Sequence, residues 1–237
     1  MRKAFKYILL LMLLAFTVAF LMTSTLFNIK TINVIGNNRV SQQEIIRVSG
    51  LSYQQNIFRI NTKETMKNIF QNPYVKKIKI RRGLPNIVNI DIIEREPIVL
   101  VPYVGSFLFV DSQGIVVEIS NSLEGMELPV IKGLKFNTFK LGEEIKVESK
   151  LQLTSVITLI NEIKRTGINQ EIAEINAENI LNLKLLTKSG IKINLGDDSN
   201  INEKIPLAKA ILQDLNSKNL KGTVEMGHKG NPVFKPE

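Results

Sequence analysis

The hydrophobic pattern of the chain begins with one long uncharged run. No charged residue occurs from Tyr7 to Ile29, and Leu, Ile, Phe, Val, Met and Ala dominate between Ile8 and Phe27. A helix needs about 20 apolar residues to cross about 30 Å of hydrocarbon, and only a helix satisfies its own backbone there. The pattern therefore predicts a transmembrane helix over residues 7–27, after a short tail of residues 1–6.

The charges that flank this run predict its orientation. Arg2, Lys3 and Lys6 precede it, whereas Lys30 stands alone behind it. Because the more positive flank of a membrane helix stays in the cytoplasm, we expect a single-pass protein of the cell membrane with a cytoplasmic N-terminus and extracytoplasmic domains. A cleaved signal peptide is the alternative, since residues 23–25 are small. The run is longer than the roughly 7–15 apolar residues of a signal peptide, however, and it lacks an A-x-A site.

The pattern of turns and helix signals after this run predicts a small α+β domain over residues 28–96. Its first element is a strand over 28–35, which ends in the turn sequence G-N-N. A helix follows, which the capping box S-Q-Q-E at 41–44 begins and S-G at 49–50 ends. A second helix begins at 61 or 62 and ends before Pro73.

Two alternating strands complete this domain. Apolar and polar residues alternate over residues 75–82 and again over 87–94, and G-L-P-N at 83–86 joins them as a hairpin loop. The predicted order is therefore β-α-α-β-β, with the two helices covering one face of the sheet.

The strand over residues 75–82 contains the densest basic cluster of the chain. Its members are Lys76, Lys77, Lys79, Arg81 and Arg82. They are candidates for a patch that docks an acidic partner or lipid. The simpler interpretation is the water-facing side of a half-buried strand, because the charges alternate with apolar residues.

A β-rich domain with two helices is predicted over residues 97–226, followed by a polar tail over 227–237. Its expected strands are 98–102, 106–110, 115–119, 172–175, 180–186, 191–195 and 223–226, and its expected helices are 148–165, with Gly167 as C-cap, and 202–215. A strand that comes last in the sequence often lies at the edge of its sheet, where its free N–H and C=O groups accept a partner strand. The alternative is that the tail Asn231 to Phe234 folds back and covers this edge.

Composition narrows the chemistry. The 237 residues include no Cys, no Trp and one His, His228. The absence of Cys excludes thiolate sites, and a single His makes a histidine-based catalytic triad improbable. Residues 1–6 hold three of the nine net positive charges, and the remaining +6 is too diffuse to indicate nucleic acid. Asp197-Asp198 is best explained as a turn and a helix N-cap. We therefore predict no catalytic, metal or cofactor site, and no enzyme.

Several segments together resemble a known family. Behind the apolar run stand F-N-I-K-T-I-N-V-I-G-N-N-R-V-S and then N-P-Y-V-K-K-I-K-I-R-R-G-L-P-N-I-V-N-I-D-I-I-E-R-E-P-I. L-F-V-D-S-Q-G at residues 108–114 and L-P-V-I-K-G at 128–133 follow in order. This arrangement resembles the FtsQ/DivIB bacterial cell-division family, whose first exported domain is a POTRA domain.

The resemblance implies a function in binding other proteins. It implies a scaffold of the divisome that binds FtsB/DivIC-like and FtsL-like membrane proteins at the septum, through the last strand of the β domain, here Thr223, Val224, Glu225 and Met226. Val224→Pro is then expected to weaken binding, because proline removes a ladder donor. The alternatives are a membrane-anchored protein that binds or modifies cell-wall polymer, and a POTRA-bearing secretion or assembly component, although no barrel pattern follows.

Overall fold

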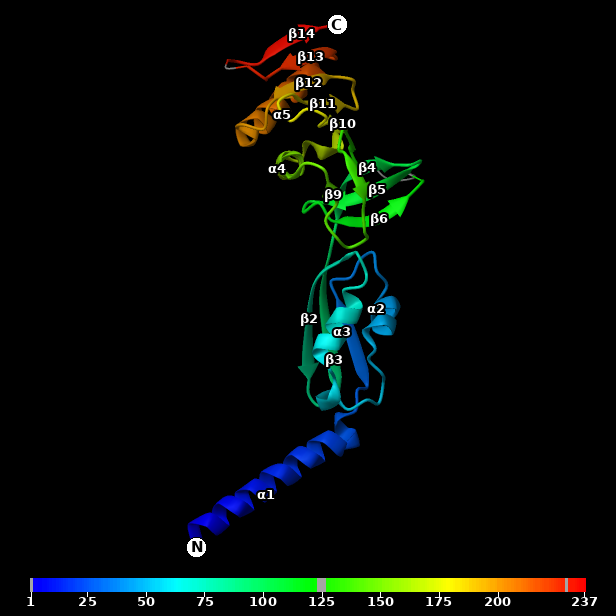
Figure 1. Ribbon diagram of the computed structural model, residues 1–237, viewed down its shortest axis with the longest axis vertical. Helices are drawn as coiled ribbons and strands as arrows, with labels where there is room; N and C mark the ends of the chain where they lie inside the picture. Colours follow the sequence, from blue (N-terminus) through cyan, green and yellow to red (C-terminus); the bar gives the residue numbers. More distant parts are fainter. Residues whose placement is uncertain (1, 123–126, 229) are drawn as a thin grey trace. The chain divides into compact units, whose positions relative to one another are not determined.

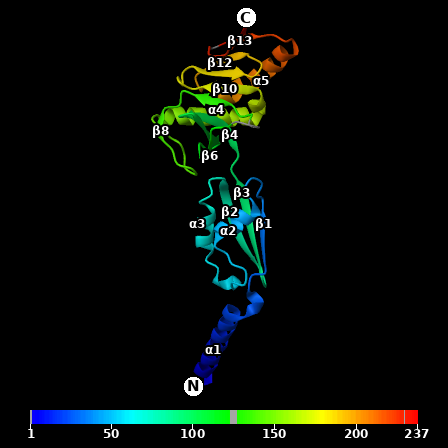
Figure 2. The same ribbon diagram turned by 90° about the vertical axis from the view of Figure 1, so that its right-hand side faces the viewer.

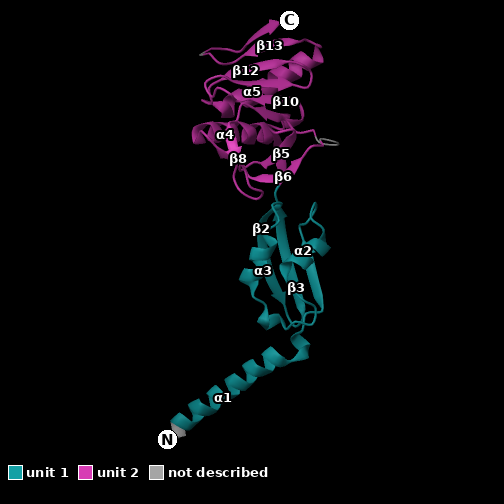
Figure 3. Cartoon of the chain, turned by 45° about the vertical axis from the view of Figure 1, so that its right-hand side comes forward, with its two compact units in different colours: residues 1–95 teal, residues 96–237 magenta. Residues whose placement is uncertain are grey.

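The protein forms two compact units, residues 1–95 and residues 96–237. The structure is a computed structural model that describes residues 2–122, 127–228 and 230–237 (Figure 1). Figure 3 colours the first unit teal and the second magenta.

Unit 1 is an apolar helix followed by a small α+β domain. Its elements are, in chain order, α1 (Arg2–Thr23), the 3-10 turn η1 (Thr25–Phe27), β1 (Thr31–Ile35), α2 (Gln42–Ser49), the 3-10 turn η2 (Ile57–Arg59), α3 (Thr62–Ile69), β2 (Val75–Gly83) and β3 (Ile87–Glu94). After α1, the order of helices and strands is the predicted β-α-α-β-β.

Helix α1 is the most hydrophobic element of the described chain. Its segment Ala4–Thr23 has a mean hydropathy of 2.3 and is long and apolar enough to cross a membrane. The helix ends at Thr23 and not at Phe27 as predicted, because the Ser24 side chain accepts a hydrogen bond from the Leu26 N–H and opens the turn η1. The predicted positive flank includes Arg2 and Lys3, whose side chains lie outside the described part of the chain.

The sheet of unit 1 has the strand order β1-β3-β2 in the residues described. Strand β3 pairs parallel with β1 and antiparallel with β2. Helices α2 and α3 cover one face (Figure 2), against which Val88, Ile90 and Ile92 of β3 are buried. The other face is open and carries the polar residues of the alternating pattern, which confirms the predicted two-layer arrangement.

Local capping signals set the helix boundaries of unit 1 as predicted. The Ser41 side chain accepts the Glu44 N–H at 3.1 Å, and the Asn61 side chain accepts the Glu64 N–H at 3.3 Å. Gly50 ends α2 at φ +71°, in the left-handed region that glycine adopts without strain. Gly36 is required at φ +85° because a Cβ there would lie 2.2 Å from the Ile92 carbonyl oxygen.

Unit 2 is a large mixed sheet with helices on one face. Its elements are β4 (Pro97–Tyr103), β5 (Ser106–Asp111), β6 (Val116–Ser120), β7 (Val130–Lys132), β8 (Phe136–Thr138), β9 (Lys146–Val147), α4 (Lys150–Thr166), the 3-10 turn η3 (Ile168–Gln170), β10 (Ile172–Asn176), β11 (Leu183–Thr187), β12 (Lys192–Gly196), α5 (Ile201–Ser217), β13 (Gly222–Glu225) and β14 (Val233–Pro236).

The order of the large sheet, over the described residues, is β14-β13-β12-β11-β10-β7-β4-β5-β6. Helices α4 and α5 pack on one face, where apolar side chains such as Leu159, Leu212 and Ile193 form one core. The predicted helices and strands are present, and Gly167 caps α4 as expected. Strands β7, β8 and β9 were not predicted, because two or three residues are too few to show a period of two.

Candidate functional site

The C-terminal edge of the large sheet differs from the prediction. Strand β13 pairs parallel with β12 and antiparallel with β14, in the register Val224 opposite Phe234. The prediction that residues 223–226 form the open edge is therefore wrong, and the alternative of a tail that folds back is the observed one. The physical reason is the sequence between the two strands, since Gly227, Gly230 and Pro232 are turn-forming residues that allow the chain to reverse.

The four residues predicted to bind a partner are mostly interior. Val224 is 1% exposed and Met226 is buried, with its N–H donating to the Asn194 carbonyl at 2.8 Å. Thr223 and Glu225 are half-buried on the other face of the sheet. The β13 backbone is thus paired on both sides, with β12 and with β14.

Glu225 ties three strands together on that face. Its carboxylate accepts a hydrogen bond from the Asn194 amide of β12 at 3.0 Å and lies 3.4 Å from the Lys235 ammonium of β14. The hydrogen bond from Asn194 and the positive charge of Lys235 hold the pKa of Glu225 below its ordinary value. This carboxylate therefore supports the sheet edge in its ionised form.

The backbone that remains free at this edge belongs to β14. Just beyond the strand, the Glu237 N–H donates to the Lys221 carbonyl at 3.2 Å. In an antiparallel pair the bonded residues alternate, so Lys235 and Val233 also face β13, whereas Phe234 and Pro236 face outward. Proline has no N–H, and Phe234 therefore provides the outward donor of the strand.

An apolar groove lies beside this edge. Its volume is about 520 Å³, and it is lined by Ala210, Ile211, Asp214, Leu215, Lys218, Leu220, Val224, Pro232 and Phe234. Its walls thus come from α5, β13 and β14, and the Asp214–Lys218 ion pair of 2.7 Å stands at its polar part. A free strand edge next to an apolar groove can bind the backbone and the side chains of one peptide segment at the same time.

The structure divides the predicted basic patch of β2 into two kinds of residue. Arg81 makes a two-pronged ion pair with Asp91 of β3, at 2.6 and 2.7 Å, and this hydrogen bond lowers the pKa of Asp91. Arg82 donates to the carbonyls of Ile57 and Ile60 from the helix-covered side. These two arginines serve the fold of unit 1.

The lysines of the patch differ from these two arginines in their surroundings. Lys77 and Lys79 are exposed on the open face of the sheet and Lys76 is half-buried. The patch belongs to unit 1 and the β14 edge to unit 2, so the two predicted sites are separate surfaces.

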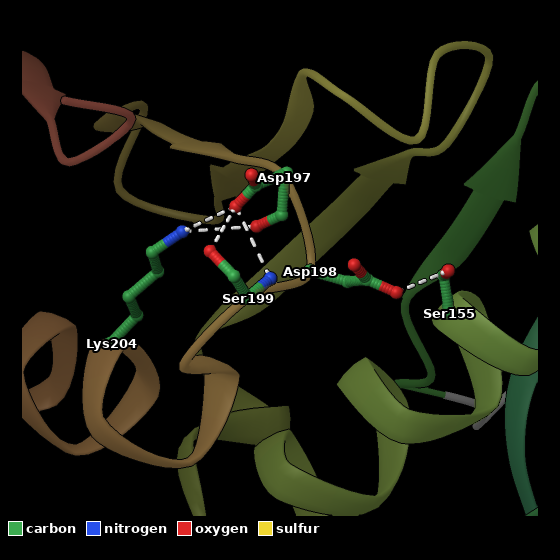
Figure 4. A network of polar contacts seen from close by, with 5 residues as sticks. All are labelled: Ser155, Asp197, Asp198, Ser199 and Lys204. Carbon is green, nitrogen blue, oxygen red and sulfur yellow. Dashed lines mark hydrogen bonds and ion pairs between the residues drawn. The ribbon is translucent and has the colours of Figure 1, made fainter.

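The paired carboxylates Asp197 and Asp198 do not converge on one site (Figure 4). Asp197 accepts hydrogen bonds from the Ser199 hydroxyl, from the Ser199 N–H at 3.2 Å and from Lys204 at 3.2 Å, and its pKa is lowered first by the Ser199 hydroxyl and then by Lys204. Asp198 points away and accepts the Ser155 hydroxyl of α4 at 2.5 Å. The predicted turn is present, but the N-cap position falls on Asn200. The cluster joins α4 to the start of α5.

Among the described side chains, no group of three His, Cys, Asp or Glu residues is placed to hold a metal ion. Glu94, at the end of β3, accepts the backbone N–H groups of Asn38, Arg39 and Val40 at 2.8–3.0 Å. No short-range signal in the sequence indicated this contact, because Glu94 is more than 50 residues away from the loop that it binds.

Comparisons with known proteins agree with this architecture. The family model of the POTRA domain, FtsQ-type, matches residues 27–95. The model of the cell division protein FtsQ/DivIB, C-terminal, matches residues 100–226.

Named relatives extend these matches over most of the chain. The cell division protein DivIB of Clostridium acetobutylicum is 32% identical over 211 residues, which cover 88% of this chain and 82% of the relative. DivIB of Clostridium botulinum is 29% identical over 242 residues, covering 98% and 92%. The cell division protein FtsQ of a Geobacter species is 25% identical over 195 residues, covering 81% and 69%. With a POTRA domain behind an apolar helix and the family's C-terminal domain after it, this chain belongs to the FtsQ/DivIB family of cell division proteins.

Proposed function

We propose that this chain is a bitopic membrane scaffold that binds FtsB/DivIC-like and FtsL-like division proteins and so organises septum formation. The observation that carries the proposal is the succession of an apolar helix, a POTRA domain and the FtsQ/DivIB C-terminal domain in one chain. The proposed domains are a cytoplasmic tail 1–6, a transmembrane helix that starts at 7 and ends with α1 at Thr23, the POTRA domain 28–96, and an extracytoplasmic β domain that starts at 97 and whose sheet includes β14.

Membrane attachment is the first part of this proposal. Helix α1 has the length and hydropathy of a membrane span, and the basic residues before it favour a cytoplasmic N-terminus. Confinement to one membrane raises the effective concentration of partners that are anchored in the same membrane. A scaffold can then act with modest intrinsic affinities.

Partner binding at the C-terminal edge is the second part. We propose that β13 supports this site through the residues Thr223, Val224, Glu225 and Met226. Val224 lines the groove, and the Glu225 carboxylate pairs with Lys235 of β14. Strand β14 supplies the free backbone at Phe234. A partner segment would add one strand to the sheet and place apolar side chains in the groove.

The basic strand is proposed as a second docking patch, for an acidic partner. Lys76, Lys77 and Lys79 are the candidates within it, because Arg81 and Arg82 already bind groups of unit 1. Exposed cations of this kind contribute to the rate of association and to its salt dependence more than to affinity.

We further propose that the chain acts by binding and not by catalysis. FtsQ/DivIB is a family of division proteins that are not known as enzymes. The two neighbouring carboxylates Asp197 and Asp198 bind different partners of the fold, which supports this view.

A localisation experiment tests the proposed function. A fluorescent fusion of the full chain is expected to concentrate at the septum of dividing cells. Uniform distribution over the membrane would contradict the proposal. The alternative of a wall-polymer-binding protein predicts instead that the protein binds anionic wall polymer in a strongly salt-dependent manner.

A further inference from the structure

Three segments of unit 1 meet where the chain leaves α1. The Lys30 N–H donates to the carbonyl of Asn86, in the β2–β3 hairpin loop, at 2.9 Å. The Gln54 N–H donates to the Ile29 carbonyl at 2.9 Å, and the Ile29 N–H donates to the Gln55 carbonyl at 2.9 Å. The segments 24–31, 52–59 and 82–87 therefore form one end of the domain, next to the end of the apolar helix.

Each of these segments exposes one large side chain with apolar surface. Leu26 is 55% exposed, Tyr53 is 56% exposed and Leu84 is 61% exposed, and none of the three belongs to the core of unit 1. We call these three residues the juxtamembrane patch. Exposed apolar side chains at the end of a domain that adjoins a membrane helix are placed to reach the membrane interface.

The charges of the same segments have one sign. Segments 24–31, 52–59 and 82–87 contain Lys30, Arg59 and Arg82, all exposed, and no Asp or Glu. The chain as a whole has 22 acidic residues, so their absence here is a local feature. Segments that combine exposed apolar side chains with cations are complementary to an anionic lipid headgroup layer.

Side-chain contacts hold the end of α1 to this surface. Asn56 is only 7% exposed, and its amide donates to the carbonyls of Leu21 at 3.0 Å and Ser24 at 3.3 Å. The rings of Phe27 and Phe58 lie 5.1 Å apart between their centroids. The patch is thus tied to the last turn of the helix and cannot separate from it without breaking these contacts.

We propose that the juxtamembrane patch lies in the outer headgroup layer of the membrane that α1 spans. Leu26, Tyr53 and Leu84 enter the interface, where tyrosine and leucine bury apolar surface and the tyrosine hydroxyl stays hydrated. Lys30 and Arg59 bind anionic headgroups, while Arg82 holds the carbonyls of Ile57 and Ile60. This inference rests on the membrane anchor of the proposed function, and it adds that the POTRA domain itself is docked on the lipid.

Site-directed spin labelling tests this inference directly, because the chain has no cysteine that would have to be removed. Leu84→Cys and Tyr53→Cys place a label in the patch. Ile35→Cys and Ile93→Cys are matched controls, since these residues are 52% and 55% exposed at the other ends of β1 and β3. Ala15→Cys places a label within α1.

Each labelled full chain is reconstituted in vesicles of phosphatidylglycerol and phosphatidylcholine without any other protein. The measured quantity is the ratio of label accessibility to oxygen, which concentrates in lipid, and to a water-soluble nickel chelate. We expect this ratio to be several-fold higher at Leu84 and Tyr53 than at Ile35 and Ile93. In pure phosphatidylcholine the ratio at Leu84 is expected to fall, because the cations lose their anionic partners.

The other outcomes separate this inference from the anchor on which it rests. A lipid-exposed label at Ala15 with a water-exposed label at Leu84 overturns the docking and leaves the anchor intact. A water-exposed label at Ala15 overturns the anchor and the docking together. If the Leu84 label becomes shielded only after a second division protein is added, the patch is a protein-binding surface and the lipid inference is wrong.

Discussion

Strand β2 of unit 1 and strand β14 of unit 2 both lie at the edge of a sheet, yet their chemistry differs. Strand β2 is nine residues long and carries Lys77, Lys79 and Arg81 along the open face of its sheet. Strand β14 is four residues long and stands beside an apolar groove of about 520 Å³. Exposed cations on an edge strand discourage pairing with another chain. Strand β14 carries one lysine, Lys235, whose ammonium lies 3.4 Å from the Glu225 carboxylate, so this pairing and the groove favour β14 as the edge that accepts a partner strand.

The comparison also shows what a short edge needs in order to bind. Few main-chain hydrogen bonds are available on β14, because Phe234 supplies the outward donor and Pro236 supplies none. Backbone pairing alone would be weak, so the groove formed with α5 must supply side-chain contacts. An edge becomes a binding site where the backbone and the neighbouring side chains both favour the same partner.

The largest expected effect comes from proline in the strand next to this edge. Val224 is buried between β12 and β14, and Val224→Pro removes a ladder donor and leaves the side-chain site poorly filled. We expect unit 2 to lose about 4 kcal/mol or more of unfolding free energy. Hydrogen exchange on the full chain measures this loss and shows whether unit 1 keeps its protection.

A matched variant keeps the backbone donor at the same position. Val224→Ala is expected to cost about 2 kcal/mol, because only the side-chain contacts are lost. Equal losses for alanine and proline would show that this ladder bond contributes little. A simultaneous loss of protection in units 1 and 2 would contradict the expectation that the effect is confined to unit 2.

A smaller effect is expected in unit 1 from Glu94→Ala. The carboxylate accepts three backbone N–H groups of the loop between β1 and α2, and such charge-assisted bonds have a large net effect. We expect a loss of about 2–3 kcal/mol in a urea titration. Glu44→Ala is the control, since the Glu44 carboxylate pairs with the exposed Arg47 and solvent screens this pair, so its loss should have a much smaller effect. Equal effects of the two substitutions would contradict this role of Glu94.

The smallest effects concern pH. The pKa of Glu225 is lowered in the folded state, first by the hydrogen bond from Asn194, so its contribution to stability is present above the ordinary glutamate pKa of 4.5 and is lost as pH falls through the folded value. The pKa of Asp91 in unit 1 is likewise lowered, first by the hydrogen bond from Arg81. Its contribution to stability is therefore present above the ordinary aspartate pKa of 3.8 and is lost as pH falls below it.

Urea titrations between neutral and acid pH test both groups. Glu225→Gln should flatten part of the acid loss of stability in unit 2 only, and Asp91→Asn should do so in unit 1 only. An unchanged acid dependence in either variant would mean that the carboxylate in question does not contribute in this way.

Much of the fold could be predicted because its signals are local. Ser41 and Asn61 cap their helices, Gly50 ends one of them, and the alternation in β2 and β3 identifies both strands and their buried faces. These features depend on residues within one or two turns of each other. Local sequence is sufficient to determine such boundaries.

The candidate site was predicted less well because it depends on strand order. Residues 223–226 were correctly identified as a strand, but their place next to the edge depends on V-F-K-P at 233–236, where four residues show almost no period. The groove requires α5, β13 and β14 to come together in space. The pairing of β13 with β12 and the packing of α5 against these strands join residues that are far apart in the sequence, so no local sequence pattern predicts them.

The most direct test of the central claim is the affinity of the full chain, in a membrane environment, for an FtsB/DivIC-like partner. Phe234→Pro removes the outward donor of β14, Phe234→Ala removes only the side chain, and Lys79→Glu alters the edge of unit 1. We expect the proline variant to bind at least about tenfold more weakly than the alanine variant, a difference of about 1.4 kcal/mol, and Lys79→Glu to bind normally. Normal binding by Phe234→Pro, or a loss confined to Lys79→Glu, would contradict the assignment of the partner site to β14.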